Sequence, residues 1–187
     1  HVLCKEDAAK PLIFVIRGTH SAKDMITNLT GSVCPHHTMG GDAGEDLKVG
    51  YAHSGFLTTA KFLERKIKDS LLSAMENNPG YQLKIVGHSL GGGVSVLLTE
   101  MLRQDARFRS AGLHCFTFAC PSTLSRELAE SCQSFVTTCV NNADLVPMVS
   151  FSKVTELQRE VVSTALEQRL LEKWKKASQA VMAPCAR

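Results

Sequence analysis

Hydrophobic residues along this chain fall into two patterns, which alternate from one end to the other. Short apolar runs rich in β-branched residues predict buried strands, here over residues 12–16, 81–86, 113–120 and 135–140. Segments in which apolar residues recur every three or four positions predict helices with one apolar face, here over residues 54–78, 91–107, 125–132 and 154–180. Strands that alternate with helices indicate an α/β fold with a mostly parallel sheet flanked by helices.

The segments between these elements are polar. Residues 21–29 are expected to form a short helix, and residues 30–50, rich in Gly and His, predict a surface loop. No repeat or linker interrupts the pattern. A chain of 187 residues can bury a sizeable core, so we expect one domain over residues 1–187. No apolar run is long enough for a membrane span.

Composition narrows the function classes. A net charge of +3 is too small to indicate a nucleic-acid partner. The basic cluster Lys173, Lys175 and Lys176 fits a solvated helix face, with contact to an anionic membrane surface as the less favoured alternative. The seven cysteines show no metal-ligand spacing, so no metal site is expected. Cys115 and Cys120 lie in an apolar run, which favours reduced core thiols and a reducing compartment.

One short motif carries recognisable chemistry. Gly87-His88-Ser89-Leu90-Gly91 fits the pattern G-x-S-x-G, and it directly follows a predicted strand and opens a predicted helix. Such a turn is sharp and strained, and it exposes the serine hydroxyl above the sheet. Glycine at the two flanking positions leaves room for the turn. The sequence therefore predicts Ser89 as a nucleophile, rather than a chance glycine-rich turn.

A nucleophilic serine needs a base and an acid that orients the base. Asp144 follows a later predicted strand, and loops at the carboxyl ends of strands carry functional groups in such sheets. A lone Asp after a strand can also be a simple turn former, but we favour the catalytic role.

The oxyanion of the reaction needs two donors. One is expected from the N–H of Leu90, the residue after the nucleophile. Thr19, which follows the first predicted strand in Arg17-Gly18-Thr19, is the candidate for the second, through its N–H and also its hydroxyl.

Together these stretches resemble the class 3 lipases, which include fungal triacylglycerol lipases and sn-1-specific diacylglycerol lipases. The likeness runs from about residue 12 to residue 176, and the diacylglycerol lipases look most similar. The matching stretches are Phe14 to Thr19, His53 to Phe56, Ile85 to Gly92, and Asp144 to Pro147. The resemblance implies the α/β-hydrolase fold, hydrolysis of glycerolipid esters without a cofactor, and substrates bound at a membrane or lipid surface.

The resemblance also implies roles for single residues. It assigns Ser89 as nucleophile, Asp144 as acid, and Thr19 with Leu90 as the oxyanion hole. His88 is then a structural residue, and His53 packs near the site without being the base. Residues 21–29 fall where fungal members carry a lid helix. A membrane-associated protein that faces the cytoplasm is expected, with any targeting or membrane-spanning segment outside this chain.

The sequence departs from the family pattern at the base. In this fold the histidine follows the acid along the chain, whereas all seven histidines precede Asp144. We therefore expect a truncated catalytic domain, with the histidine beyond Arg187 and little activity in this fragment. The alternatives are a triacylglycerol lipase or phospholipase A1 of the same family, a scaffold that binds lipid or protein without hydrolysis, and, less favoured, a peptidase or other acyl hydrolase.

Overall fold

The structure of the chain is a computed structural model, and it describes residues 2–5, 10–18, 32–40, 46–148 and 151–182. The chain separates into two compact units, His1–Phe151 and Ser152–Arg187. Each unit is described by itself. The expectation of one domain over the whole chain stays a prediction.

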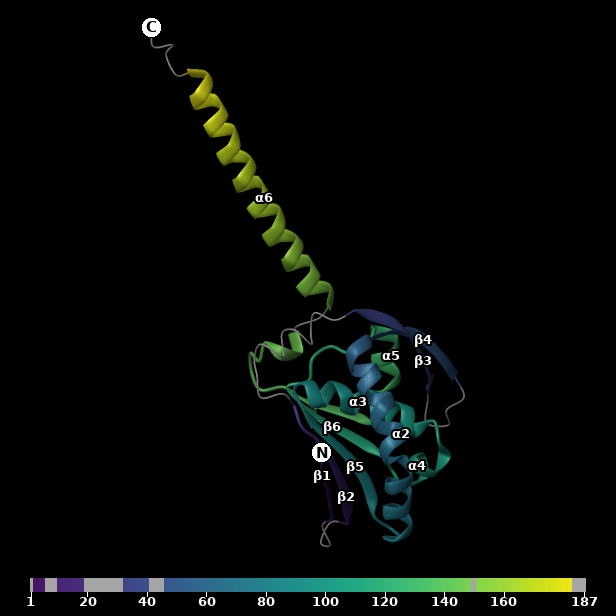
Figure 1. The fold of residues 1–187 in the computed structure, drawn as a ribbon. Coiled ribbons are helices and arrows are strands. Elements are labelled where there is room, and N and C mark those ends of the chain that lie inside the picture. Colours follow the sequence, from purple (N-terminus) through teal and green to yellow (C-terminus); the bar gives the residue numbers. More distant parts are fainter. Residues whose placement is uncertain (1, 6–9, 19–31, 41–45, 149–150, 183–187) are drawn as a thin grey trace. The chain divides into compact units, whose positions relative to one another are not determined.

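A five-stranded sheet forms the centre of the first unit (Figure 1). Its strands lie in the order β1-β2-β5-β6-β7, and only β1 is antiparallel to its neighbour. The strands are β1 (Val2–Lys5), β2 (Pro11–Ile16), β5 (Gln82–His88), β6 (His114–Phe118) and β7 (Val136–Cys139). The expected mostly parallel sheet with flanking helices is confirmed, and β1 is an additional edge strand.

Among the described residues of this unit, the α-helices are α2 (Ser54–Glu76), α3 (Leu90–Arg103), α4 (Ala106–Ser110) and α5 (Arg126–Ser131). The apolar face expected for residues 54–78 is the buried side of α2, and α3 buries twelve consecutive residues, Gly91 to Leu102. Helix α3 packs against α2 and against β2, β5 and β6. The main core lies in this layer and includes the fully buried Leu83, Ile85 and Leu97.

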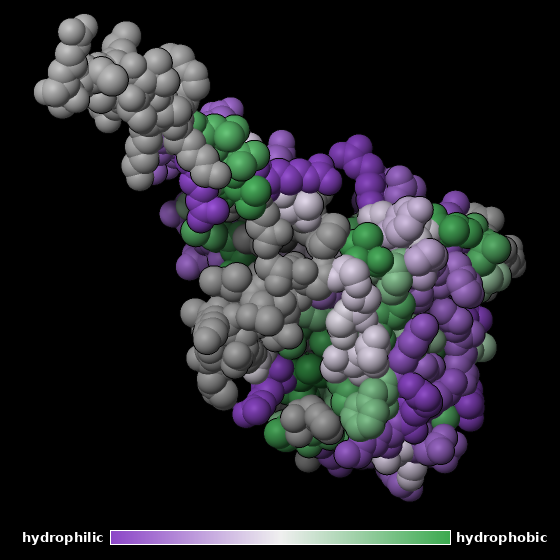
Figure 2. Space-filling view, turned by 45° about the horizontal axis from the view of Figure 1, so that its top comes forward, coloured by the Kyte–Doolittle hydropathy of each residue, from purple (hydrophilic) through white to green (hydrophobic). Residues whose placement is uncertain are grey.

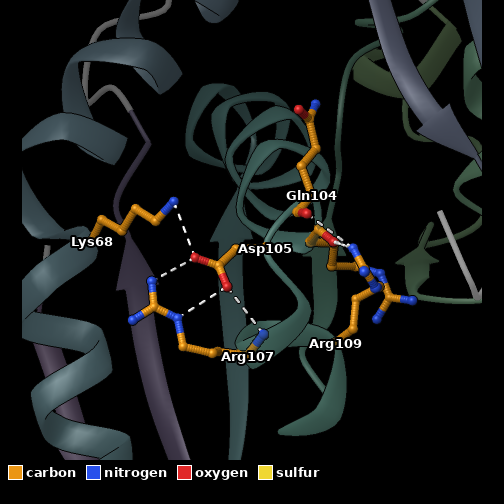
Figure 3. Close-up of polar contacts among 6 residues, drawn as sticks. Lys68, Gln104, Asp105, Arg107 and Arg109 are labelled. Carbon is orange, nitrogen blue, oxygen red and sulfur yellow. Dashed lines mark hydrogen bonds and ion pairs between the residues drawn. The ribbon is translucent and has the colours of Figure 1, made fainter.

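The expected helix over residues 91–107 ends earlier than the sequence pattern indicated, because Asp105 starts a new one. The Asp105 carboxylate accepts a hydrogen bond from the Arg107 N–H at 3.1 Å and so caps α4. The guanidinium of Arg107 and the ammonium of Lys68 also contact this carboxylate, at 2.7 and 3.4 Å (Figure 3). The Arg107 hydrogen bonds hold the pKa of Asp105 well below its usual range.

The predicted surface loop over residues 30–50 is wrong for its described part. Strands β3 (Val33–Gly40) and β4 (Asp46–His53) pair as an antiparallel hairpin, and α5 packs against both. The inward side chains of β3 include two polar ones, His36 and Thr38, while the outer face of β4 carries apolar side chains. Strands usually turn apolar side chains inward and polar ones outward. Because the hairpin reverses this pattern, the sequence did not indicate its strands. The expected helix over residues 21–29 lies outside the described residues.

A short 3-10 helix, η1 (Val146–Met148), follows the last strand of the sheet, and α6 (Phe151–Met182) follows η1. The long helix expected near the end of the chain is confirmed, but the expectation that it has one apolar face is wrong, because its apolar residues are spread around the helix. Its residues 159–170 are all exposed, including Val161, Val162, Leu166 and Leu170. Within the described residues, no helix is both long and apolar enough to cross a membrane.

Candidate active site

Ser89 lies between the end of β5 and the start of α3, where the sequence motif predicts the nucleophile. Its backbone has φ 54° and ψ −126°, in the left-handed region that residues other than glycine rarely adopt. The surrounding backbone holds this strained conformation on both sides. The Ser89 N–H donates to the carbonyl oxygen of Phe118 at 2.9 Å, and the Ser89 carbonyl oxygen accepts from the Gly92 N–H at 2.8 Å.

The two glycines of the motif are required by close backbone approach. A Cβ at Gly87 would overlap the carbonyl oxygen of Gly91, and a Cβ at Gly91 would overlap the carbonyl oxygen of Ile16. Beneath the turn, the hydroxyl of Ser95 donates to the Gly91 carbonyl oxygen at 2.7 Å and is buried. The sequence interpretation missed this contribution of Ser95, although its position four residues after Gly91 on a helix is a usable signal.

Leu90 is the first residue of α3, and the first N–H groups of a helix have no acceptor within the helix. The position suits an oxyanion donor, and that role of Leu90 stays a prediction. Thr19, the other predicted donor, lies outside the described residues. Its neighbour Gly18 is close to the serine: a Cβ there would lie 2.7 Å from the His88 carbonyl oxygen and 3.5 Å from the Ser89 Cβ.

Asp144 follows β7, two strands from β5, in the same parallel part of the sheet. Neighbouring strands lie about 4.8 Å apart, so the ends of β5 and β7 are separated by roughly 10 Å along the sheet edge. The Asp144 carboxylate accepts from the Val146 N–H at 3.0 Å and is half-buried. This contact caps the turn into η1, so the structural role of a turn former is present. The catalytic role stays a prediction.

The described histidines occupy other positions. His53 caps α2, accepting from the Phe56 N–H at 3.5 Å, and its ring stacks on Phe56 with centroids 4.4 Å apart. A Cβ at Gly93, in the first turn of α3, would lie 3.0 Å from the Phe56 ring. His53 therefore packs near the serine turn, as the sequence comparison implied. His88 is exposed at the end of β5.

His114 begins β6, at the end of the sheet away from Ser89, as the order of the strands predicted. Burial, with the nearby cations Lys84 and Arg103, lowers its pKa. His36 forms a buried pair with Glu100 of α3, and His37 next to it is exposed.

Buried thiols form a second group of titratable residues. Burial raises the pKa of Cys115 and of Cys132 to about 12 and that of Cys120 to about 11, so all three are protonated at neutral pH. All three are free cysteines, as expected for core thiols. Among the residues that the structure describes, no group of three or more His, Cys, Asp or Glu side chains could hold a metal ion.

Two cavities lie at opposite ends of the parallel strands of the sheet. One, of about 530 Å³, lies where α2 ends and β5 begins and includes Glu76 and Arg107 in its wall. The other, of about 340 Å³, lies beside the loop after β6, on the side of the sheet edge that carries Ser89. Of these two cavities, which are lined by described residues, the second lies nearer the candidate site.

A strained serine between a strand and a helix, at the carboxyl edge of a mostly parallel sheet, is the arrangement of the α/β-hydrolase fold. The family model described as Lipase (class 3) matches residues 13–154, and the chain therefore belongs to the class 3 lipase family.

Curated relatives of the chain include diacylglycerol lipases. Diacylglycerol lipase-beta of Mus musculus is 31% identical over 154 residues, which are 81% of this chain and 22% of that protein. Diacylglycerol lipase-alpha of Rattus norvegicus is 29% identical over 89% of this chain and 16% of that protein. This chain thus spans about a fifth of the length of these relatives.

Solved structures show the same fold. The lipase from Rhizopus microsporus var. chinensis superposes with a TM-score of 0.64 at 24% identity, over 79% of this chain and 50% of that one. A triacylglycerol lipase whose catalytic centre is a serine protease triad gives a TM-score of 0.65 at 24% identity, over 78% of this chain and 53% of that one. The predicted α/β-hydrolase fold is confirmed.

Proposed function

We propose that this chain is the greater part of the catalytic domain of a serine ester hydrolase that acts on glycerolipids, with diacylglycerol as the favoured substrate. The observation that carries the proposal is the backbone of Ser89, held in the left-handed region between β5 and α3. Strain of this kind persists only where the surrounding structure imposes it, and it is typical of catalytic turns. The similarity to diacylglycerol lipases supports the choice of substrate.

The reaction follows from the residues at the sheet edge. The Ser89 hydroxyl attacks the ester carbonyl carbon while a base takes its proton, and the carbonyl oxygen gains negative charge. The N–H of Leu90, at the N-terminus of α3, stabilises that oxygen together with a donor from Thr19. Asp144 orients the base. The base then gives its proton to the ester oxygen, the bond between that oxygen and the carbonyl carbon breaks, and the alcohol leaves. Water, activated by the same base, attacks the acyl group and releases it from Ser89 as a carboxylic acid.

The base is not among the residues that follow Asp144, because that part of the sequence contains no histidine. This observation supports a second candidate function, a lipase-like scaffold that binds lipid or a protein partner without hydrolysis. The two candidates differ in whether Ser89 is reactive.

Contact with a membrane or lipid surface is part of the proposal. Large hydrophobic side chains are exposed along the outer face of β4, where Leu47, Val49 and Tyr51 are 60%, 66% and 55% exposed. Figure 2 shows hydrophobic side chains in green among hydrophilic ones on one face of the molecule. Exposed apolar groups of this size favour interaction surfaces, including lipid surfaces. We place the protein at a membrane on its cytoplasmic side.

Labelling with a fluorophosphonate probe tests the proposal. In the protein expressed from its complete gene, we expect the probe to label Ser89, and Ser89→Ala to abolish both labelling and diacylglycerol hydrolysis on vesicles. Ser110→Ala, which removes an exposed hydroxyl on α4 and leaves the serine turn intact, is a control that retains labelling. Equal labelling of the Ser89→Ala variant would refute the assignment. Lipid binding without labelling of the unmodified protein would favour the scaffold.

A further inference from the structure

The first residue after β6, Ala119, has a backbone conformation that alanine rarely adopts. Its φ is 50°, in the left-handed region, where the Cβ of an L-residue crowds the backbone. Among the residues that the structure describes, Lys10, Ser89 and Asn142 are the other non-glycine residues in this region. Ala119 is half-buried at the end of the sheet that carries Ser89, where such strain persists only if the surrounding structure imposes it.

A single peptide unit, which joins Phe118 to Ala119, links the nucleophile to the strand that leads to the candidate acid. Its carbonyl oxygen, from Phe118, accepts from the Ser89 N–H at 2.9 Å. Its N–H, from Ala119, donates to the carbonyl oxygen of Cys139 at 3.1 Å. Cys139 is the last residue of β7, and the chain runs on from there to Asp144. The orientation of this peptide unit therefore fixes the nucleophile turn relative to the end of β7.

The path of the chain after Ala119 explains why the left-handed conformation is imposed. Cys120 is buried, and its side chain lies against the first turn of α3, because a Cβ at Gly92 would lie 3.3 Å from the Cys120 Cβ. Rotation about φ of Ala119 joins the bonded peptide unit on one side to Cys120 on the other. A negative φ would either turn the peptide unit out of its two hydrogen bonds or move Cys120 away from α3.

We propose that Ala119 is a positioning residue of the reaction, whose left-handed backbone holds this peptide unit in place and so sets the separation of the Ser89 hydroxyl and the Asp144 carboxylate. Ala119 touches no reacting atom and acts through these two residues. The inference rests on the proposed function, in which one base bridges Ser89 and Asp144. A base that spans a fixed gap is sensitive to its width, since a misplacement of about 1 Å can cost roughly 10²-fold in rate.

Substitutions that differ in backbone preference test the proposal. Valine is β-branched and strongly disfavours the left-handed region, whereas asparagine adopts it readily with a side chain of similar size. In the protein expressed from its complete gene, we expect Ala119→Val to slow fluorophosphonate labelling of Ser89 roughly tenfold or more, and Ala119→Asn to stay within about threefold of the unmodified protein. Equal rates in the two variants, whether both slow or both fast, would overturn the proposal.

Lys10→Val is the matched control for stability. Lys10 is also left-handed, with φ 51°, but it lies before β2, at the opposite end of the strands from Ser89. Valine imposes the same kind of backbone strain at both positions, so both variants should unfold at lower urea concentrations. Labelling of Lys10→Val should nevertheless change by less than about twofold. A loss as large as that of Ala119→Val would mean that general destabilisation is the cause, and would contradict positioning by Ala119.

A further variant guards against misfolding. If circular dichroism shows that Ala119→Val does not fold, Ala119→Leu takes its place, because leucine is not branched at Cβ and strains the left-handed backbone less. The same order of labelling rates is expected, with Ala119→Asn faster than Ala119→Leu. A folded Ala119→Leu variant that is labelled as fast as Ala119→Asn would refute the inference.

Hydrogen exchange separates this outcome from that of the proposed function, because it needs no reactive serine. Ser89 is held by the bond from its N–H to Phe118, so exchange of that N–H, followed by NMR, should be roughly tenfold faster in Ala119→Val than in Lys10→Val. Absence of labelling in the unmodified protein would count against catalysis by Ser89. Equal exchange of the Ser89 N–H in the two variants would overturn positioning by Ala119, whatever the activity.

Discussion

The imidazole Nε2 of His36 lies 2.9 Å from Oε2 of Glu100, and both side chains are buried. Sixty-four residues separate them in sequence. The second carboxyl oxygen of Glu100 accepts from the Gln104 side-chain amide at 3.0 Å, so both oxygens are engaged. The pair fixes strand β3 of the hairpin against α3, the helix that begins directly after Ser89.

Removing the imidazole should therefore destabilise the fold. His36→Ala leaves one oxygen of a buried carboxyl group without its partner, which costs about 3 kcal/mol of unfolding free energy. His37→Ala, at the neighbouring exposed position, should change it by less than about 0.5 kcal/mol. Urea unfolding followed by circular dichroism measures both. Similar midpoints for the two variants would mean that the buried contact contributes little.

The serine turn depends on its glycines, and Gly91 gives the sharper test. An added methyl group would overlap backbone carbonyl oxygens of Ile16 and Arg17, which cannot move without displacing the end of β2. Gly91→Ala should cost about 1–3 kcal/mol through overpacking and should lower fluorophosphonate labelling of Ser89 at least tenfold. At Gly92 the nearest atoms lie at 3.3 and 3.4 Å on the Cys120 side chain, so Gly92→Ala should be milder. Equal effects would contradict the steric explanation.

Much of this architecture could be predicted from the sequence, because apolar runs and helical repeats mark the elements of the parallel sheet. The edge strand β1 could not, since all four of its residues are exposed and show no alternation. The hairpin was missed because His36 and Thr38 face inward while Leu47, Val49 and Tyr51 face outward. Polar residues in the core and apolar ones outside reverse the signal that identifies a strand.

The same distinction holds for the candidate site, where local sequence predicts some features and others depend on tertiary packing. The positions of Ser89, Leu90 and Asp144 follow from local sequence, because each comes at the end of a predicted strand. The contact of Ser95 with Gly91 and the cavity beside Cys120 depend on how distant segments pack, which periodicity alone does not encode. Thr19 lies outside the described residues, so its role as an oxyanion donor remains a prediction.

Thiol reactivity should separate the cysteines into two groups. Burial raises the pKa of Cys115, Cys120 and Cys132 to about 11 or 12, so at pH 7.5 they hold almost no thiolate, the nucleophilic form. Cys4 and Cys139 are exposed. Iodoacetamide should modify the exposed pair at least tenfold faster, as measured by mass spectrometry of peptides over time. Rapid modification of Cys115 in folded protein would show that the core opens readily.

The cap of α4 should make stability depend on pH in a defined direction. The pKa of Asp105 is lowered in the folded protein, so its stabilising contribution is present above the unfolded value of about 4 and is lost as the pH falls below it. Asp105→Ala should cost about 1 kcal/mol at pH 7 through the lost cap. The difference from the unmodified protein should shrink by pH 2.5 in urea titrations. A constant difference across that range would mean that the carboxylate charge is not involved.

Asp144 has both a visible structural role and a proposed catalytic one, and two substitutions distinguish them. Asn keeps a side-chain oxygen that can accept from the Val146 N–H, so Asp144→Asn should preserve the turn into η1 and change stability by less than about 0.5 kcal/mol. Without the carboxylate charge the base is no longer held in its working form, and kcat should fall by about 10⁴. Asp144→Ala removes the cap as well, so it should lose a similar factor in kcat and in addition about 1 kcal/mol of stability. Ester hydrolysis and urea unfolding, measured on the same preparations from the complete gene, separate the two effects. If Asp144→Asn retained full turnover while Asp144→Ala lost stability, Asp144 would be a turn former only, and the acid would have to come from another residue at this sheet edge.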